Sequence, residues 1–329
     1  MNGFVHDIDP LILDLFGFKV WYYGAAYAIG FLGIHLWLLW RRRELGWTHE
    51  EVLDLSILWA SSVLIVGHLF DVFVYEWAYY RANPLHILTP WVGGYASHGV
   101  LLGALLGALL FAAWRKKSFL AIADEVVIPA AVFFGLGRIA NFINGQINGT
   151  VTDVWWAVKF PDIEGFRHPV ALYEALKNFA IIPILLLVRR HSVPGQGKLL
   201  AHFIFWYGFL RLFTDYFRTY GRQVLGIGTG QYYNLLMALV GFTLILWFSR
   251  GSEEEGAEGA GAAEEGVAND VGAATEQAPG GSIGLWIRRV IFVALLLVCL
   301  TIPSSWTKAA ELWLEGGQVT SVRLSGEGR

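Results

Sequence analysis

Arginine and amide side chains occur within stretches of this sequence that are otherwise apolar. Arg138 is followed by Asn141 and Asn144 at intervals of three, and then by Gln146 and Gly149. On a helix, side chains three residues apart share a face. The planar guanidinium group suits a phosphate, and amides at this spacing can hold glycerol or ester oxygens. The run predicts a site for a phosphate-bearing ligand, with an arginine that tethers a backbone carbonyl as the structural alternative.

A second polar run closes a later apolar stretch. Arg211, Asp215 and Arg218 follow one another at i, i+4 and i+7, so a helix would place them on one face. Two interpretations of this ladder are open. The three side chains can satisfy one another as a buried network, or the two arginines can join Arg138 in a cationic pocket for one phosphate.

A histidine and a tyrosine complete the residues that could take part in chemistry. His98 lies between small residues at the start of an apolar stretch, where a neutral imidazole could accept a proton near physiological pH. A structural histidine at the membrane surface is the alternative. Tyr23 belongs to the aromatic run Trp21–Gly24, which is also typical of an interfacial aromatic belt.

Three arginines and one histidine in apolar surroundings predict a site that is accessible from lipid. The ligand that suits this combination is the headgroup of an anionic phospholipid. The chemistry that suits it is displacement of a phosphate leaving group, with the arginines stabilising negative charge as it develops.

The composition indicates that these residues lie in a membrane. The 329-residue chain is 55% hydrophobic and 16% charged, whereas about a quarter of the residues of a soluble domain are charged. A membrane-spanning helix needs about 20 mostly apolar residues. Spans are predicted near 22–40, 52–74, 97–114, 124–142, 170–188, 199–217, 231–249 and 284–302. The expected fold class is an all-α polytopic membrane protein, a seven-span helical body followed by an eighth, C-terminal transmembrane helix.

The orientation follows from the positive charges at the ends of the spans. If the spans alternate, the clusters all fall on one side: 41–43, 115–117, 189–190, 250 and 288–289. An excess of Lys and Arg marks the cytoplasmic side. The N-terminus is therefore predicted outside, and the loops near 75–96, 143–169 and 218–230, with the candidate site, face the periplasm.

The chain is predicted to divide into four parts. Residues 1–250 form the seven-span domain, and residues 251–283, rich in Gly, Ala and Glu, form a disordered acidic linker because they offer little apolar surface to bury. Residues 284–302 form the extra transmembrane helix, and residues 303–329 form an external tail. The single cysteine, Cys299, excludes an intramolecular disulfide, and the net charge of −3 gives no reason to expect a nucleic-acid partner.

Several of these runs, in order, resemble the prolipoprotein diacylglyceryl transferase family. Residues 137–149 match the family hallmark Gly-Arg-x-Gly/Ala-Asn-Phe-x-Asn-x-Glu-x-x-Gly at every fixed position but one. Residues 168–174 resemble its His-Pro-x-x-Leu-Tyr-Glu, and residues 211–218 its Arg-Phe-x-x-Glu-x-Phe-Arg, with Asp215 replacing Glu. Residues 21–24, 91–99 and 229–231 resemble further family motifs, so the resemblance runs from about residue 15 to residue 250.

The resemblance implies a reaction and a set of residue roles. The family transfers the diacylglyceryl group of phosphatidylglycerol to the lipobox cysteine of a secreted precursor's signal peptide in the bacterial inner membrane, without a metal or organic cofactor. The implied roles are thiol deprotonation for His98, phosphate binding for Arg138 and Arg218, lipid contact near the reacting carbon for Tyr23, headgroup orientation for Asn141 and Asn144, close backbone approach for Gly149, and a share in the substrate site for Gln146, Arg211 and Asp215.

The departures from the family pattern keep two other functions open. Gln146 stands where the family motif has Glu, so an ionised carboxylate is missing, and the eighth span and acidic linker resemble no family segment. A non-catalytic paralogue that binds phospholipid, or a scaffold of the same fold, is therefore the alternative. A small-solute transporter is a further hypothesis, although the sequence lacks the paired, interrupted half-segments expected of inverted repeats.

Overall fold

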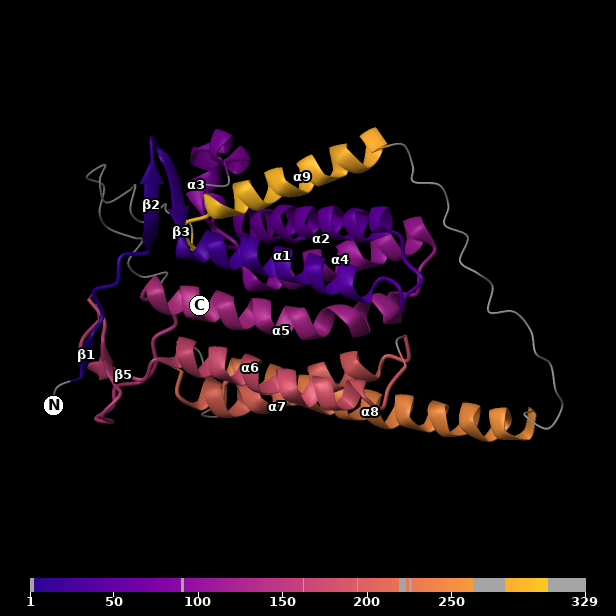
Figure 1. Ribbon diagram of the computed structural model, residues 1–329. Helices are drawn as coiled ribbons and strands as arrows, with labels where there is room; N and C mark the ends of the chain where they lie inside the picture. Colours follow the sequence, from indigo (N-terminus) through magenta and orange to yellow (C-terminus); the bar gives the residue numbers. More distant parts are fainter. Residues whose placement is uncertain are drawn as a thin grey trace.

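Long helices run side by side and make up most of this all-α polytopic membrane protein (Figure 1). The structure is a computed structural model that describes residues 3–89, 92–161, 163–193, 195–218, 223–224, 227–262 and 282–306. The helices are α1 Tyr22–Arg41, α2 His49–Phe70, the π-helix η1 Asp71–Tyr75, α3 Trp77–Ala82, the 3-10 helix η2 Pro84–Leu88, α4 Ser97–Arg115, α5 Phe119–Ile143, α6 Val170–Arg189, α7 Lys198–Tyr216, α8 Thr229–Ala262 and α9 Ser282–Leu300.

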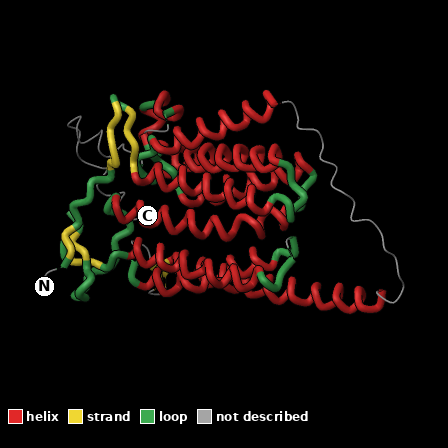
Figure 2. The backbone as a smooth tube through the Cα atoms, in the orientation of Figure 1, coloured by secondary structure: helices red, strands yellow, loops and turns green. Residues whose placement is uncertain are grey.

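Short strands accompany the helices. They are β1 Phe4–Val5, β2 Leu11–Leu15, β3 Phe18–Trp21, β4 Val158–Lys159, β5 Phe166–Arg167, β6 Gln223–Val224 and β7 Ile227–Gly228. β2 and β3 form an antiparallel hairpin, β4 lies between β1 and β5, and β6 pairs with β7. The hairpin and the β1–β4–β5 sheet lie at one end of the helices (Figure 2), so this end is elaborated by loops and strands.

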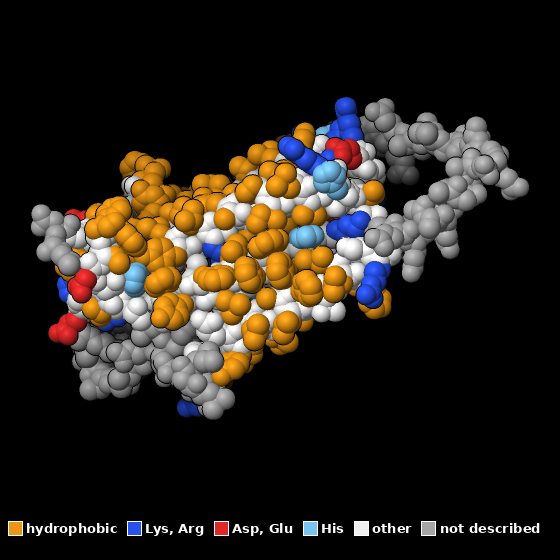
Figure 3. Space-filling model, turned by 90° about the horizontal axis from the view of Figure 1, so that it is seen from below, with side chains coloured by type: hydrophobic (Ala, Val, Ile, Leu, Met, Phe, Trp, Pro, Cys, Tyr) orange, Lys and Arg blue, Asp and Glu red, His pale blue; other side chains and the backbone are white. Residues whose placement is uncertain are grey.

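In the described part of the chain, seven helices are long and apolar enough to cross a membrane. These spans are Tyr22–Arg41, His49–Tyr75, Ser97–Arg115, Phe119–Ile143, Val170–Arg189, Gly230–Arg250 and Ile283–Leu300. α7 covers the predicted span at 199–217 but is not in that set, and it packs against α6 and α8. Figure 3 shows one face of the molecule with hydrophobic side chains over its middle and Lys and Arg gathered near one end, as a membrane-embedded surface requires.

Ion pairs bring the predicted basic clusters to one end of the bundle. Arg41 at the end of α1 pairs with Glu125 near the start of α5, with Nε to Oε2 at 3.1 Å. Lys117 Nζ lies 2.8 Å from Glu51 Oε1, and Arg115 pairs with Asp54. Because Glu51 and Asp54 belong to the first turns of α2, the ends of successive helices alternate between the two ends of the bundle as expected.

The C-terminal helix α9 lies along α1 and α2 rather than apart from the body (Figure 1). Phe292 and Cys299 of α9 are buried, and so is Ile302 just after it. α8 continues to Ala262, twelve residues beyond Arg250, into the stretch expected to be a linker. The remainder of that stretch, 263–281, and residues 307–329 of the predicted tail lie outside the described residues.

Glycines allow α2 and α4 to pack closely. A Cβ atom at Gly103 would overlap the backbone oxygen of Ser62, and one at Gly107 would lie 3.0 Å from Cδ1 of Trp59. Small residues at a helix contact permit the backbones to approach, which strengthens van der Waals packing within lipid.

Gly103→Ala should lower the free energy of unfolding by about 2 kcal/mol, because the added methyl group overpacks the α2–α4 contact. The matched control is Gly33→Ala on α1, where an added Cβ meets no atom within 4 Å. Thermal unfolding of the purified protein in detergent should show a lower Tm for Gly103→Ala only. Equal Tm values for the two variants would contradict this packing.

Candidate active site

A buried carboxylate lies at the polar end of the bundle, which is the end opposite the basic clusters. The side chain of Glu174 is 0% exposed, and three guanidinium groups approach it: Nε of Arg138 at 2.8 Å, Nη1 of Arg211 at 3.5 Å and Nη1 of Arg218 at 4.0 Å. A charge removed from water is costly unless it is paired, so these groups depend on one another. Glu174 supplies one negative charge against three positive ones, and a cluster of this kind attracts a further anion.

The helices explain how these side chains meet. Arg138 lies near the end of α5, Glu174 near the start of α6, and Arg211 and Arg218 near the end of α7. α5 packs against α6, and α6 packs against α7. Because consecutive helices run in opposite directions, the end of α5, the start of α6 and the end of α7 lie at the same end of the bundle.

Polar groups with unused hydrogen-bonding capacity surround Glu174. Lys177, one turn later on α6, is buried, and its Nζ lies 3.4 Å from the centre of the Tyr207 ring. Nη1 of Arg211 donates to the Tyr207 hydroxyl at 3.2 Å. Among the described residues, Glu174 Oε1 and Lys177 Nζ have no hydrogen-bond partner. Buried polar atoms are usually bonded, so this interior suits a polar guest or water.

The structure distinguishes the two interpretations of the Arg211–Asp215–Arg218 ladder. Asp215 is buried, and its Oδ2 accepts a hydrogen bond of 3.0 Å from Nδ2 of Asn234 on α8. Arg211 and Arg218 instead reach Glu174 of α6, as Arg138 does. The arginines of the two predicted runs therefore converge in one cluster.

Gly149 connects the loop after α5 to the end of α7. Its N–H donates to the backbone oxygen of His168 at 2.9 Å, and it forms a β-bridge with Arg218. A Cβ atom here would lie 2.7 Å from the backbone oxygens of both His168 and Phe217, so only glycine fits. Burial lowers the pKa of His168 below its ordinary value, which favours a neutral ring beside this junction.

The predicted amides form a buried network. Asn141 is 6% exposed and Gln146 is 3% exposed, and Nδ2 of Asn141 donates to Oε1 of Gln146 at 2.8 Å. Nδ2 of Asn144 donates to the backbone oxygen of Pro303 at 3.0 Å. Ser304 and Ser305, which follow α9, bond to Gln146 as well. The end of the C-terminal helix thus meets the amides that the hallmark motif supplies.

Tyr23 and His98 lie at the same end of the bundle but in different surroundings. Tyr23 is buried, and its hydroxyl lies 3.3 Å from that of Tyr27. His98 is exposed, and its Nδ1 lies 3.1 Å from the Tyr75 hydroxyl while its ring stacks on Phe70. In the described part of the chain, no hydrogen bond or ion pair joins His98 to the arginine cluster.

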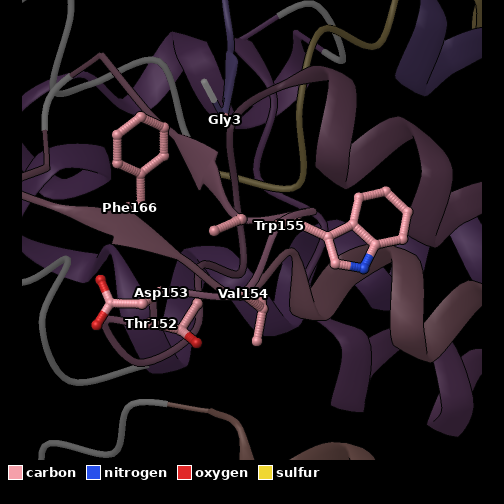
Figure 4. A pocket seen from close by; sticks show the side chains of 7 residues that line it. Gly3, Thr152, Asp153, Val154, Trp155 and Phe166 are labelled. Atoms are coloured by element: carbon pink, nitrogen blue, oxygen red, sulfur yellow. The ribbon is translucent and has the colours of Figure 1, made fainter. Parts of the chain in front are cut away.

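A separate cavity of about 190 Å³ lies beside the β1–β4–β5 sheet (Figure 4). It is lined by Gly3, Thr152, Asp153, Val154, Trp155, Ala157 and Phe166. None of the predicted site residues lines it. Among the described residues, its walls are mainly apolar and include the carboxylate of Asp153 but no Lys or Arg side chain, so this cavity does not suit a phosphate.

Glu174 was not among the residues selected from the sequence. It closes the quoted His-Pro-x-x-Leu-Tyr-Glu run, so the motif contained the signal, but no spacing within α6 relates it to Arg138 or Arg211. Lys177, Ser304 and Ser305 were missed for the same reason, since their partners belong to other helices.

Glu174→Gln should lower the free energy of unfolding by about 3 kcal/mol, because it leaves three partly buried guanidinium groups without their carboxylate. Glu164→Gln, on an exposed loop residue, is the control and should leave stability unchanged. Thermal unfolding in detergent measures both variants. A Glu174→Gln protein as stable as the control would show that the arginines do not depend on this carboxylate.

Comparisons with a family model and with known proteins point to the same family. The family model described as prolipoprotein diacylglyceryl transferase matches residues 10–247. A phosphatidylglycerol–prolipoprotein diacylglyceryl transferase of Photobacterium profundum is 35% identical over 250 residues, which cover 73% of this chain and 93% of that protein. The protein of the same name from Geobacter sulfurreducens is 36% identical over 253 residues, 74% of this chain and 96% of that protein. The chain belongs to the prolipoprotein diacylglyceryl transferase family.

Proposed function

We propose that this protein transfers the diacylglyceryl group of phosphatidylglycerol to the lipobox cysteine of prolipoprotein signal peptides, the first step of lipoprotein maturation. The observation that carries the proposal is the convergence of Arg138, Arg211 and Arg218 on Glu174 at the polar end of a membrane bundle. The relatives that bear the name of this activity match most of the chain and support the same assignment.

The reaction requires charge stabilisation at a phosphate. The cysteine sulfur forms a bond to the terminal glycerol carbon of the diacylglyceryl group, and the bond between that carbon and the phosphate oxygen breaks. Glycerol phosphate leaves with the electron pair, and the thiol proton is released. Negative charge therefore grows on the phosphate, where Arg138 and Arg218 stabilise it.

The remaining site residues hold the lipid. Asn141, Asn144 and Gln146 orient the glycerol headgroup through their amides, and the buried Tyr23 contacts the lipid near the reacting carbon. Arg211 and Asp215 support the phosphate site from α7, and Gly149 allows the loop to approach Arg218. No metal or organic cofactor enters this mechanism.

His98 takes the thiol proton in this proposal. Its exposed position beside Tyr75 leaves the imidazole accessible to a peptide that approaches through the lipid. A neutral imidazole is a suitable acceptor at physiological pH. The cysteine would therefore be deprotonated at the edge of the site, while the phosphate is held in its interior.

The proposed location is the bacterial inner membrane, with the N-terminus and the site on the periplasmic side. The basic clusters lie at the opposite end from the arginine site, and positive charge favours the cytoplasm. Residues 1–250 form the transferase domain in this proposal, and 251–283 form an acidic linker to the added helix, 284–302, and an external tail, 303–329.

Arg138→Ala should lower the transfer rate by about 100-fold or more, because one stabilising group is lost at the leaving phosphate. The assay uses purified protein, labelled phosphatidylglycerol and a lipobox peptide, and it detects the thioether product. Arg43→Ala, an exposed arginine at the other end of the bundle, is the charge-matched control. Full activity in Arg138→Ala would refute its phosphate role.

Complementation separates the transferase from a lipid-binding paralogue. The protein should restore growth to a bacterium depleted of its own transferase, because each turnover supplies the missing thioether. If the wild-type protein is inactive in both the thioether assay and the complementation assay while a known transferase works in parallel, the non-catalytic alternative is favoured.

The orientation can be tested with two cysteine variants. Glu164→Cys should react with a membrane-impermeant maleimide in intact spheroplasts, whereas Arg43→Cys should react only after the membrane is permeabilised. Both native residues, Glu164 and Arg43, are exposed, and the native Cys299 is buried. The opposite labelling pattern would overturn the proposed orientation.

A further inference from the structure

The residues that follow α9 are inserted among the amides of the candidate site. Nε2 of Gln146 donates to Oγ of Ser304 at 2.6 Å, and Oγ of Ser305 donates to Oε1 of Gln146 at 3.1 Å. Nδ2 of Asn141 lies 3.3 Å from Oγ of Ser305. These serines lie beyond residues 10–247, the part of the chain that matches the family.

α9 is fixed at both ends, so the serines are held in place. Nε of Arg288, near its start, lies 2.8 Å from Oδ1 of Asp54 on α2. At the other end, a Cβ atom at Gly24 would overlap the backbone oxygen of Cys299, so α1 and α9 can approach only because residue 24 is glycine. The buried Phe292 and Ile302 add apolar contacts along this helix.

The loop before α4 holds the same segment from another side. The N–H of Tyr95 donates to the backbone oxygen of Ser305 at 3.1 Å. Gly93 has φ +90°, and a Cβ atom there would lie 2.6 Å from the backbone oxygen of Trp306. Contacts from this loop and from α5 therefore fix the serine hydroxyls relative to Gln146.

An amide at position 146 matches these partners. Its oxygen accepts from Asn141 and Ser305, and its nitrogen donates to Ser304. Gln146 is 3% exposed, and a neutral amide at this depth avoids the cost of burying a charge. The residue that departs from the family Glu thus bonds directly to the segment that follows α9.

We propose that Ser304 and Ser305 are positioning residues of the transferase site, which hold Gln146 and Asn141 in the orientation that receives the lipid headgroup. This inference rests on the proposed function. A helix outside the family-matched region completes the substrate site from within the same chain.

The test is a kinetic comparison of Ser305→Ala, Ser304→Ala and Gln146→Ala in the full chain. Ser305→Ala should raise KM for phosphatidylglycerol about tenfold, the effect of losing one buried hydrogen bond, and leave KM for the lipobox peptide unchanged. Loss of folded protein would instead lower kcat and leave both KM values unchanged. Thr301→Val is the matched control, because the Thr301 hydroxyl bonds only the backbone oxygen of Val298 in its own helix turn among the described residues.

A double variant shows whether Ser305 acts through Gln146. Ser305→Ala combined with Gln146→Ala should raise KM by less than the product of the two single effects, because Gln146→Ala already removes the Ser305–Gln146 hydrogen bond and leaves Ser305 its contact with Asn141. If the KM increases of the two single variants multiply in the double variant, the proposal is overturned. It is also overturned if Ser305→Ala has the same KM values as Thr301→Val. If Ser305→Ala does not fold, Ser304→Ala carries the same test against Gln146.

An inactive wild-type protein would reject both the proposed function and the positioning role of the serines. An active wild-type protein whose serine variants are unaffected would reject only the positioning role.

Discussion

The burial of Glu174 is the constraint on which the polar end of this protein depends. A carboxylate with 0% exposure is stable only when cations lie beside it. Here they come from α5, from α7 and from Arg218 just after α7, while Glu174 itself belongs to α6. The three helices must therefore meet at one end and in one register. The same requirement creates a concentration of positive charge inside a membrane protein, where charge is costly and usually functional.

The sequence predicted the membrane architecture well because hydropathy and charge are local signals. Each predicted span coincides with a helix, from 22–40 with α1 to 284–302 with α9, and the basic clusters meet at one end. Partners across helices were harder to predict. The spacing of Arg211, Asp215 and Arg218 left open both a self-contained ladder and a cationic pocket shared with Arg138. In the structure, Asp215 bonds Asn234 of α8 and Arg211 reaches Glu174. Spacing within one helix does not specify which neighbouring helix supplies the partner.

The structure gives Gln146 a role that the sequence alone did not indicate. In the motif it is the position where a carboxylate is missing, and this departure kept a non-catalytic paralogue open as an alternative. In the fold, its oxygen accepts hydrogen bonds from Asn141 and Ser305, and its nitrogen donates one to Ser304. No feature of the local sequence relates residues 146 and 304, since they meet only because α9 packs along α1 and α2. The added helix is thereby connected to the amides beside the arginine cluster.

The central claim is that the arginine cluster binds the phosphate that leaves in the reaction. Its most direct test is the dissociation constant of glycerol 1-phosphate, measured by calorimetry on wild-type protein and on Arg218→Ala. The account predicts binding to the wild type that inorganic phosphate competes away, and affinity at least about tenfold weaker in Arg218→Ala, the loss of one charged hydrogen bond. Equal affinity in the two proteins, or no binding to the wild type, would contradict it.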